Sequence, residues 1–419
     1  MEKVFVVFAD TEKKEEEERK RREEELEFLE LVKACDFQIE AIFSQLLKSI
    51  TLKTYIGSGK CLEIQEALQD SDISYIIFHQ DLTPLQIRNL EALFHVPVMD
   101  RSELILAIFS RRAKSPAAKL QIESAQLKKM LPRLIGSNTQ LSRQGGSGFN
   151  KGSGEKQLEL DRRRIKSRIS EVDRELKKLA TQRKTQRKAR EKNALPLVAL
   201  VGYTNAGKST ILNRVLTHCK GKEEKKVLEK DMLFATLDTS IRQIQLPHGH
   251  SFLLSDTVGF ISHLPHELIK AFHSTLEEVR YADLLLQVVD ASSKQHNQHI
   301  DITMDTLRQI GAADIPMLII YNKCDKTSYT HPQIQNHHLY LCAKDDKEVD
   351  YLIQKITETL FPEKKVEMFL PYTQYNIYSY LKEHAHILKE KQEEEGISIC
   401  LYINDRIYKK YKDFIQKVF

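Results

Sequence analysis

Eight consecutive residues, 202–209, carry a spacing that can bind the phosphates of a nucleotide. They follow the short apolar run Leu197–Val201, which is typical of a buried strand, and a helix is expected to begin near Lys208. The glycines let backbone N–H groups point at phosphate oxygens, and the helix N-terminus adds a favourable dipole. We expect Lys208 to neutralise the β- and γ-phosphates and the Ser209 hydroxyl to ligate Mg²⁺. The predicted nucleotide contacts of this loop are Gly202, Tyr203, Thr204, Asn205, Ala206, Gly207, Lys208 and Ser209.

A second candidate lies at the end of the apolar run Phe252–Ser255, where Asp256, Thr257, Val258 and Gly259 follow in order. Asp256 is placed to hold Mg²⁺, and the Gly259 amide can contact a γ-phosphate that is present only in GTP. An Asp-x-x-Gly alone is mostly a turn, but its position after a strand and a phosphate loop makes it a predicted switch.

Between these two motifs a threonine is needed to close over Mg²⁺ and the γ-phosphate. Thr236 is our choice and Thr239 is the alternative that spacing leaves open. The predicted contacts around it are Phe234, Ala235, Thr236, Leu237 and Asp238.

Selection of the base is predicted from the residues after the apolar run Met317–Tyr321, which are Asn322, Lys323, Cys324 and Asp325. The Asp325 carboxylate can accept hydrogen bonds from the N1–H and N2–H₂ of guanine, a pair of donors that adenine lacks. Lys323 can lie over the base plane, and Asn322 can tie this loop to the phosphate loop. Downstream, the main-chain N–H groups of Cys342, Ala343 and Lys344 are placed to contact the guanine O6. The motifs together predict a GTPase.

Two positions bear on how fast GTP is hydrolysed. Ras-like GTPases carry a water-orienting Gln directly after the switch glycine, whereas this chain has Phe260, which cannot hydrogen-bond water. We therefore expect slow intrinsic hydrolysis that a partner stimulates; the alternative is that Phe260 only packs and water is oriented from elsewhere. Asn205 is compatible with a bound K⁺ that offsets charge, and a loop Asn that bonds only backbone is the more ordinary interpretation.

The elements that must position these residues are those of an α/β protein. In the N-terminal third, expected strands alternate with expected helices, which favours a parallel sheet. The strands are Val4–Phe8, Phe37–Phe43, Tyr75–Phe78 and Val96–Met99, and the helices are Leu26–Cys35, Lys60–Gln69, Pro84–Leu93 and Ser102–Arg112. The fourteen charged residues Glu12–Glu25 are either an extension of a helix or disordered.

A long helical pattern over Leu120–Leu134, with an end expected near Pro132, and a second from Glu155 to about Lys192 flank a glycine-rich stretch, 145–154. Two such helices predict an antiparallel hairpin. From Arg162 to Lys192 there are fourteen Lys or Arg against four Asp or Glu, a charge pattern that binds phosphate backbones. The tip suits an RNA cavity; a coiled-coil spacer is the alternative. In the tail, strands are expected at Val366–Pro371 and Ile397–Ile403, around a helix from Tyr375 to Lys391.

Composition restricts the class of protein further. The 419 residues allow two or three compact domains, and the net charge is only +5. No apolar run approaches the roughly 18 residues that a membrane helix needs. The apolar stretch at the start of the sequence is too short to be the core of a signal peptide. We therefore expect a cytoplasmic chain. Six widely spaced cysteines favour reduced thiols over disulfides or zinc.

The chain resembles the HflX family of translational GTPases over nearly its whole length. The resemblance rests on Tyr55–Lys60, Leu82–Leu90 and Val98–Ser102 near the start, on Lys119–Glu123, Leu131–Leu134 and Gly152–Glu159 with Asp161–Arg163 in the hairpin, and on Phe234–Asp238 and Asp256–Phe260. It favours Thr236 over Thr239. The charged run, the glycine-rich loop and Asp238–Arg242 depart from the family pattern, which puts the detail of RNA contact in question rather than the GTPase.

The resemblance implies a fold and a role. The fold is a P-loop GTPase domain (194–364) with an N-terminal α/β domain (1–113), a helical hairpin (114–193) and a small C-terminal α/β appendage (365–419). The role is a monomeric factor that binds the ribosome, chiefly the large subunit and its RNA, and splits stalled ribosomes under stress. A large-subunit assembly or hibernation factor is the second hypothesis. Some members also hydrolyse ATP through the N-terminal region, where we find no second phosphate loop.

Overall fold

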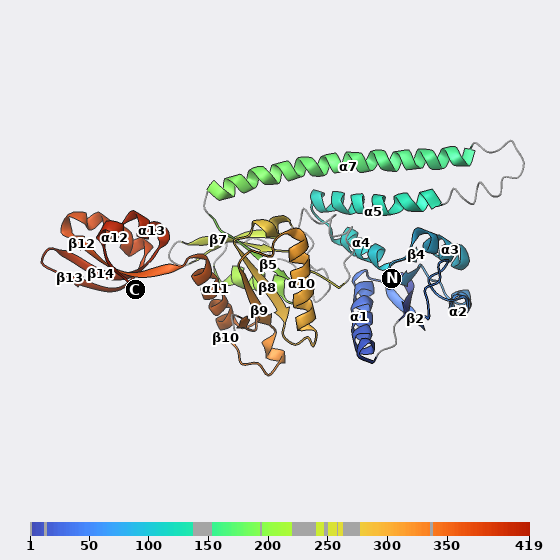
Figure 1. Ribbon diagram of the computed structural model, residues 1–419, viewed down its shortest axis with the longest axis horizontal. Helices are drawn as coiled ribbons and strands as arrows, with labels where there is room; N and C mark the ends of the chain where they lie inside the picture. Colours follow the sequence, from blue (N-terminus) through green and yellow to red (C-terminus); the bar gives the residue numbers. More distant parts are fainter. Residues whose placement is uncertain are drawn as a thin grey trace, which may run out of the picture. The chain divides into compact units, whose positions relative to one another are not determined.

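The computed structural model describes residues 2–11, 15–136, 153–192, 195–219, 240–246, 250–257, 259–262, 277–335 and 338–419 (Figure 1). The chain packs as two compact units. The first comprises Met1–Lys192, Lys230–Thr239 and Val258–Glu277, and the second comprises Asn193–Glu229, Ser240–Thr257 and Glu278–Phe419. The finer division into four domains stays a prediction.

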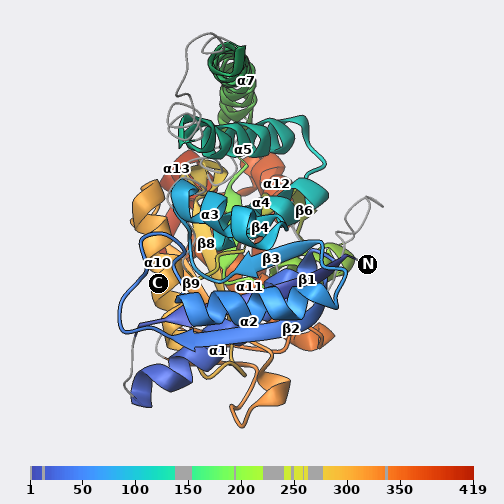
Figure 2. The same ribbon diagram turned by 90° about the vertical axis from the view of Figure 1, so that its right-hand side faces the viewer.

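The first unit begins with a four-stranded parallel sheet in the order β2-β1-β3-β4, which faces the viewer in Figure 2. Six consecutive residues of β1, Val4–Ala9, are buried, as expected for a parallel strand covered on both faces. The predicted strands and helices of this region are confirmed, with ends that differ from those expected. The elements are β1 (Lys3–Asp10), α1 (Glu15–Ala34), β2 (Gln38–Leu46), α2 (Ser58–Gln69), β3 (Tyr75–Phe78), α3 (Pro84–Phe94), β4 (Val98–Met99) and α4 (Arg101–Arg112).

Helix starts in this unit follow from capping residues. Thr83 and Gln86 form a reciprocal capping box at α3, with Pro84 in the first turn. Asp100 caps α4 by accepting the Glu103 N–H at 2.8 Å. Residues 15–25 of the charged run form the start of α1, so for these residues the helix extension is the correct alternative.

Two long helices, α5 (Pro116–Gly136) and α7 (Ser153–Lys192), form the predicted hairpin and lie antiparallel in Figure 1. The expected end of α5 near Pro132 is wrong, because this proline lies inside a helix that continues to Gly136. Arg168 donates to both carboxylate oxygens of Glu123, at 2.6 and 3.0 Å, and joins the two helices. Most of the glycine-rich stretch lies outside the described residues.

The second unit contains a seven-stranded sheet in the order β10-β11-β9-β8-β5-β7-β6. The strands from β11 to β7 run parallel, and the edge strands β6 and β10 are antiparallel. Because parallel strands end at one edge, the loops after β5, β7, β8 and β9 gather there, where nucleotides bind in such sheets. The elements are β5 (Leu197–Gly202), α8 (Lys208–His218), β6 (Ser240–Gln245), β7 (Ser251–Asp256), η2 (Glu277–Tyr281), β8 (Leu284–Asp290), α10 (His296–Ile310), β9 (Met317–Asn322), η3 (Cys324–Lys326), β10 (Gln333–Gln335), β11 (His338–Tyr340) and α11 (Asp346–Leu360).

The chain ends in a separate antiparallel sheet in the order β13-β14-β12-β15. The predicted helix over Tyr375–Lys391 is only partly correct: it ends at His384, and the following residues form β13, whose pairing with β14 overrides their polar composition. The elements are β12 (Glu363–Pro371), η4 (Tyr372–Gln374), α12 (Tyr375–His384), β13 (His386–Gln392), β14 (Gly396–Asn404), α13 (Asp405–Lys410), η5 (Lys412–Phe414) and β15 (Ile415–Val418).

Within the described ranges, no helix has the length and apolar character that a bilayer crossing requires. All six cysteines fall in those ranges, and no disulfide joins any of them.

Candidate nucleotide site

The phosphate loop has a backbone shape that requires glycine at two positions. Gly202 has φ of 139° and Gly207 has φ of 99°, both in the region that favours glycine. A Cβ at Gly202 would collide with the Val288 carbonyl oxygen of β8, and one at Gly207 would collide with the Asn322 side chain. Asn205 adopts φ of 60°, which asparagine tolerates better than most residues. The tight loop after β5 therefore follows directly from the sequence.

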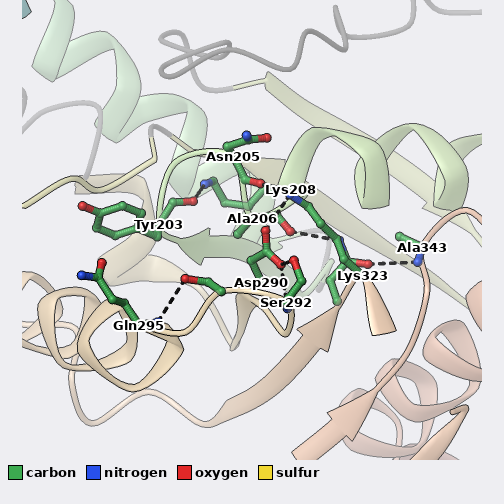
Figure 3. Close-up of polar contacts among 11 residues, drawn as sticks. Tyr203, Asn205, Ala206, Lys208, Asp290, Ser292, Gln295, Lys323 and Ala343 are labelled. Carbon is green, nitrogen blue, oxygen red and sulfur yellow. Dashed lines mark hydrogen bonds and ion pairs between the residues drawn. The ribbon is translucent and has the colours of Figure 1, made fainter. Parts of the chain in front are cut away.

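Lys208 is buried, although its side chain carries an amine. Its Nζ donates to the carbonyl oxygens of Gly202, at 3.0 Å, and Tyr203, at 2.7 Å, so the ammonium lies inside the loop that should cradle phosphate (Figure 3). Burial lowers the pKa of Lys208 from 10.5 to about 8, against the opposing effect of Asp256. Phosphate oxygens that replace the two carbonyls would favour the charged amine.

Ser209 and Asp256 meet beside the loop. The Ser209 hydroxyl donates to Asp256 Oδ2 at 2.8 Å, and the Asp256 side chain is fully buried at the end of β7. The neighbouring Thr257 hydroxyl donates to the Leu200 carbonyl oxygen at 2.6 Å, which fastens the end of β7 to β5. A hydroxyl and a carboxylate that converge in this way are a donor set of the kind that Mg²⁺ prefers.

Asn322 joins the phosphate loop to the loop at Ala343. Its Nδ2 donates to the Ala206 carbonyl oxygen at 2.9 Å, and its Oδ1 accepts the Ala343 N–H at 3.0 Å. Figure 3 shows the dashed contact that reaches Ala343. Three segments that are far apart in sequence are held in register by one amide side chain.

The Lys323 side chain also contacts the phosphate loop. Its Nζ donates to the Asn205 carbonyl oxygen at 2.8 Å and pairs with Asp290 Oδ2 at 2.7 Å (Figure 3). Ser292 donates to Asp290 Oδ1 at 2.6 Å. Burial raises the pKa of Asp290, but the hydrogen bonds from Lys323 and Ser292 outweigh it and hold the pKa below its ordinary value. Asp290 is therefore an ionised anchor that orients Lys323.

The residues expected to read the guanine edge form a connected group. Asp325 is exposed, and its Oδ1 accepts the Cys342 thiol at 3.3 Å. The Cys342 N–H donates to Glu348 Oε2 at 2.6 Å, and Glu348 Oε1 contacts His331 Nδ1 at 2.7 Å. Glu348 is buried, and its hydrogen bond from the Cys342 N–H holds the 342–344 loop in place. Lys344 is exposed at the end of that loop.

Tyr203 carries a ring contact that the sequence did not predict. It stacks on His299 of α10, with ring centroids 3.8 Å apart and planes at 12°. Burial lowers the pKa of His299 to about 4, so the imidazole is neutral at pH 7. The stack fixes the first turn of the phosphate loop against α10.

The predicted switch is described only in part. Phe234, Ala235, Thr236, Leu237, Asp238 and Val258 lie outside the described residues. Gly259 and Phe260 belong to the first unit, and Phe260 is 2% exposed. In the same unit, the Ser262 carbonyl oxygen accepts a hydrogen bond at 2.9 Å from the buried Arg101. The segment after the switch glycine is thus packed with the N-terminal elements.

Three contributors were missed from the sequence: Asp290, Glu348 and His299. Asp290 had a signal, because it ends an apolar strand, β8, next to β5 and β9 at the same edge. Glu348 and His299 lie in amphipathic helices and had none. The parallel sheet, the glycine-shaped phosphate loop and the asparagine that joins it to a base-reading loop define a P-loop GTPase.

Comparison with known proteins agrees with this class. GTPase HflX of Caldanaerobacter subterraneus is 42% identical over 390 residues, which is 93% of this chain and 89% of that protein. GTPase HflX of Escherichia coli (strain K12) is 38% identical over 384 residues, 90% of this chain and 88% of that protein. The chain belongs to the HflX family of GTPases, and it hydrolyses GTP.

Three family descriptions match consecutive parts of the chain: "GTP-binding GTPase N-terminal" at 22–110, "GTP-binding GTPase Middle Region" at 112–190 and "50S ribosome-binding GTPase" at 197–323. Among solved structures, a GTP-binding protein from Sulfolobus solfataricus in complex with GDP aligns with 86% of this chain and 99% of its own, at 24% identity and a TM-score of 0.47.

Proposed function

We propose that this GTPase is a monomeric cytoplasmic factor that binds the ribosome through the large subunit and uses GTP to split or recycle stalled ribosomes under stress. The observation that carries the proposal is the α5–α7 hairpin, with a strongly basic second helix. The match of 197–323 to the description "50S ribosome-binding GTPase" supports the same partner.

The hairpin has the size and charge for contact with ribosomal RNA. The 40 residues of α7 form a helix about 60 Å long at about 1.5 Å per residue. Val172 is fully buried, whereas the side chains of Arg163 and Arg164 are 73% and 75% exposed. Ion pairs of such exposed arginines with Glu159 and Asp161 on the same helix are weak, so the guanidinium groups remain available to phosphates.

We assign the phosphate-binding roles to the residues that converge after β5. Lys208 would leave its two carbonyl partners and neutralise the β- and γ-phosphates, and the loop N–H groups would bind the remaining oxygens. The donor pair of Ser209 and Asp256 fits Mg²⁺, with Ser209 as a direct ligand and Asp256 acting through water. When bound, Mg²⁺ offsets charge on the phosphates. Thr236 and Gly259 are the proposed switch contacts to the metal and the γ-phosphate.

We assign base selection to the group around Asp325. Its exposed carboxylate would accept the guanine N1–H and N2–H₂, with the aliphatic part of Lys323 against the ring. The 342–344 loop would supply a main-chain N–H to O6. Because the Ala343 N–H already donates to Asn322, the amide of Lys344 is the better candidate for that contact.

We propose slow intrinsic hydrolysis that the ribosome stimulates. The Phe260 side chain has no polar group that could orient water, and it is buried, so a rearrangement of its segment would have to precede fast turnover. Asn205 is exposed on the loop, where a K⁺ could bind; comparing turnover in potassium and sodium salts tests this part separately.

The splitting hypothesis and the assembly or hibernation hypothesis predict different experimental outcomes. With GTP, the chain should convert purified stalled ribosomes into subunits on a sucrose gradient, and with GDP it should not. A large-subunit assembly or hibernation factor, whose affinity GTP only sets, would leave ribosomes intact, and its deletion would accumulate subunit precursors. The second outcome would replace the splitting proposal.

The hairpin has its own test. Replacing 148–154 by a short linker should leave intrinsic hydrolysis intact and abolish stimulation by large subunits. Equal stimulation of the variant and the original chain would remove the hairpin tip from the proposal.

A further inference from the structure

The C-terminal sheet has the connectivity β-α-β-β-α-β, and within the described residues 338–419 its α-helices cover only one face. The strand order β13-β14-β12-β15 places β12 and β14 in the centre. Helices α12 and α13 cover the same face in Figure 1 and pack on one apolar core. The core residues include Val366, Met368, Leu370, Ile399 and Leu401 from the two central strands and Leu381 and Ile407 from the helices.

The opposite face follows from the alternation of side chains along the strands. Cross-strand partners share a face, so the register aligns them in rows. One row contains Tyr402 and Lys365. Phe419 extends this row, because its N–H donates to the Lys365 carbonyl oxygen at 2.9 Å. The next contains Lys389, Cys400, Glu367 and Lys417. The third contains Lys391, Ser398 and Phe369.

This helix-free face combines cations with aromatic rings. Its rows hold four lysine side chains and one acidic side chain, that of Glu367. The Phe419 ring is 59% exposed, and it has Lys417 Nζ at 4.5 Å and Lys365 Nζ at 5.0 Å from its centroid. Lysines beside exposed rings are the combination that binds a single-stranded nucleic acid, where phosphates need cations and unpaired bases stack.

We propose that this face, defined by the three rows, binds single-stranded RNA. By analogy of architecture, a four-stranded sheet with aromatic residues on its central strands is a known platform for unstacked bases. A duplex would hide its bases from the rings. An acidic protein surface would satisfy the lysines but leave the rings without a stacking partner.

The charges on this face also indicate which end of it binds the RNA more tightly. The turn Glu393–Glu395 joins β13 to β14 at the end where Pro371 faces Gly396, and Glu393 pairs with Lys391 at 3.7 Å. Phosphates are repelled from that end. The opposite end, with Lys365, Lys417 and Phe419, is where the strand should bind most tightly. This inference stands on the sheet and does not depend on the role proposed for the hairpin.

The test uses the full chain and a fluorescent eight-nucleotide RNA in an anisotropy titration. The double variant Lys417→Glu, Phe419→Ala alters two exposed residues, so the fold should persist. We expect its affinity to fall at least about tenfold, since stacking and a phosphate contact are both lost. The salt dependence should weaken by about 0.7 in slope for the lost lysine contact. Lys409→Glu, an equal charge change on α13, is the matched control and should bind like the original chain.

Unchanged affinity in the double variant, or an equal loss in Lys409→Glu, would overturn the proposal. So would equal binding of duplex RNA through the same two residues, or cross-links from this face in the ribosome complex that reach only protein. If the double variant loses the oligonucleotide but keeps stimulation by large subunits, this face and the proposed function are independent. Loss of stimulation with unchanged oligonucleotide binding would count against this face as an RNA site.

Discussion

Glu348 offers a quantitative test of how the base-reading loop is held. Its carboxylate is buried and accepts the Cys342 N–H at 2.6 Å, while the other oxygen contacts His331 at 2.7 Å. Glu348→Ala leaves a buried N–H without its acceptor, which costs about 1–3 kcal/mol. If nucleotide binding requires the loop in its present place, GDP affinity should fall by up to the same free energy, roughly 5- to 150-fold.

The assay is a titration of GDP into Glu348→Ala, Glu348→Gln and the control Lys347→Ala, which changes the exposed neighbour on α11. Glu348→Gln keeps a neutral acceptor and should lose less affinity. A GDP analogue whose base lacks the 6-oxo group should bind the original chain and Glu348→Ala almost equally, because it cannot use the loop N–H. Glu348→Ala with unchanged GDP affinity, or an equal loss for GDP and the analogue, would refute the reasoning.

Other predictions concern the phosphates, the base and the N-terminal unit. Lys208→Ala should abolish nucleotide binding; in the original chain GDP affinity should fall above pH 8, by up to about tenfold per pH unit, because the free amine has a pKa of about 8 and phosphate needs it charged. A pH-independent affinity up to pH 9.5 would contradict this. Asp325→Asn should shift preference from guanine towards xanthine nucleotides in competition titrations; unchanged selectivity would exclude its role. Arg101→Met removes a buried cation that pairs with Glu27 at 2.9 Å, and chemical denaturation should show a loss of about 3–5 kcal/mol. Adding Glu27→Gln should recover part of it, and an unchanged midpoint would be inconsistent with a buried ion pair.

The sequence predicted best what is encoded locally. The phosphate loop depends on Gly202, Gly207 and Lys208 within a few residues, and the apolar strands before each motif place the motifs at one sheet edge without further information. The parallel N-terminal sheet and the hairpin were accessible for the same reason, since continuous apolar strands and long helical patterns survive in a single sequence.

What the sequence did not reveal depends on contacts between distant segments. Glu348 is one acidic residue among several on α11, and only the fold brings it beneath Cys342. The helix expected over Tyr375–Lys391 extends into β13, whose polar residues form a strand because they pair with β14. The helix-free face of the C-terminal sheet likewise emerges only from the register of four strands.

Stimulation by the ribosome is tested by measuring GTP turnover by the full chain, alone and with purified large ribosomal subunits, at low and at physiological salt. We expect slow turnover by the chain alone, because Phe260 supplies no water-orienting group, and a large stimulation by subunits that weakens as salt screens the basic hairpin. Fast turnover alone, or no stimulation by subunits at either salt concentration, would contradict it.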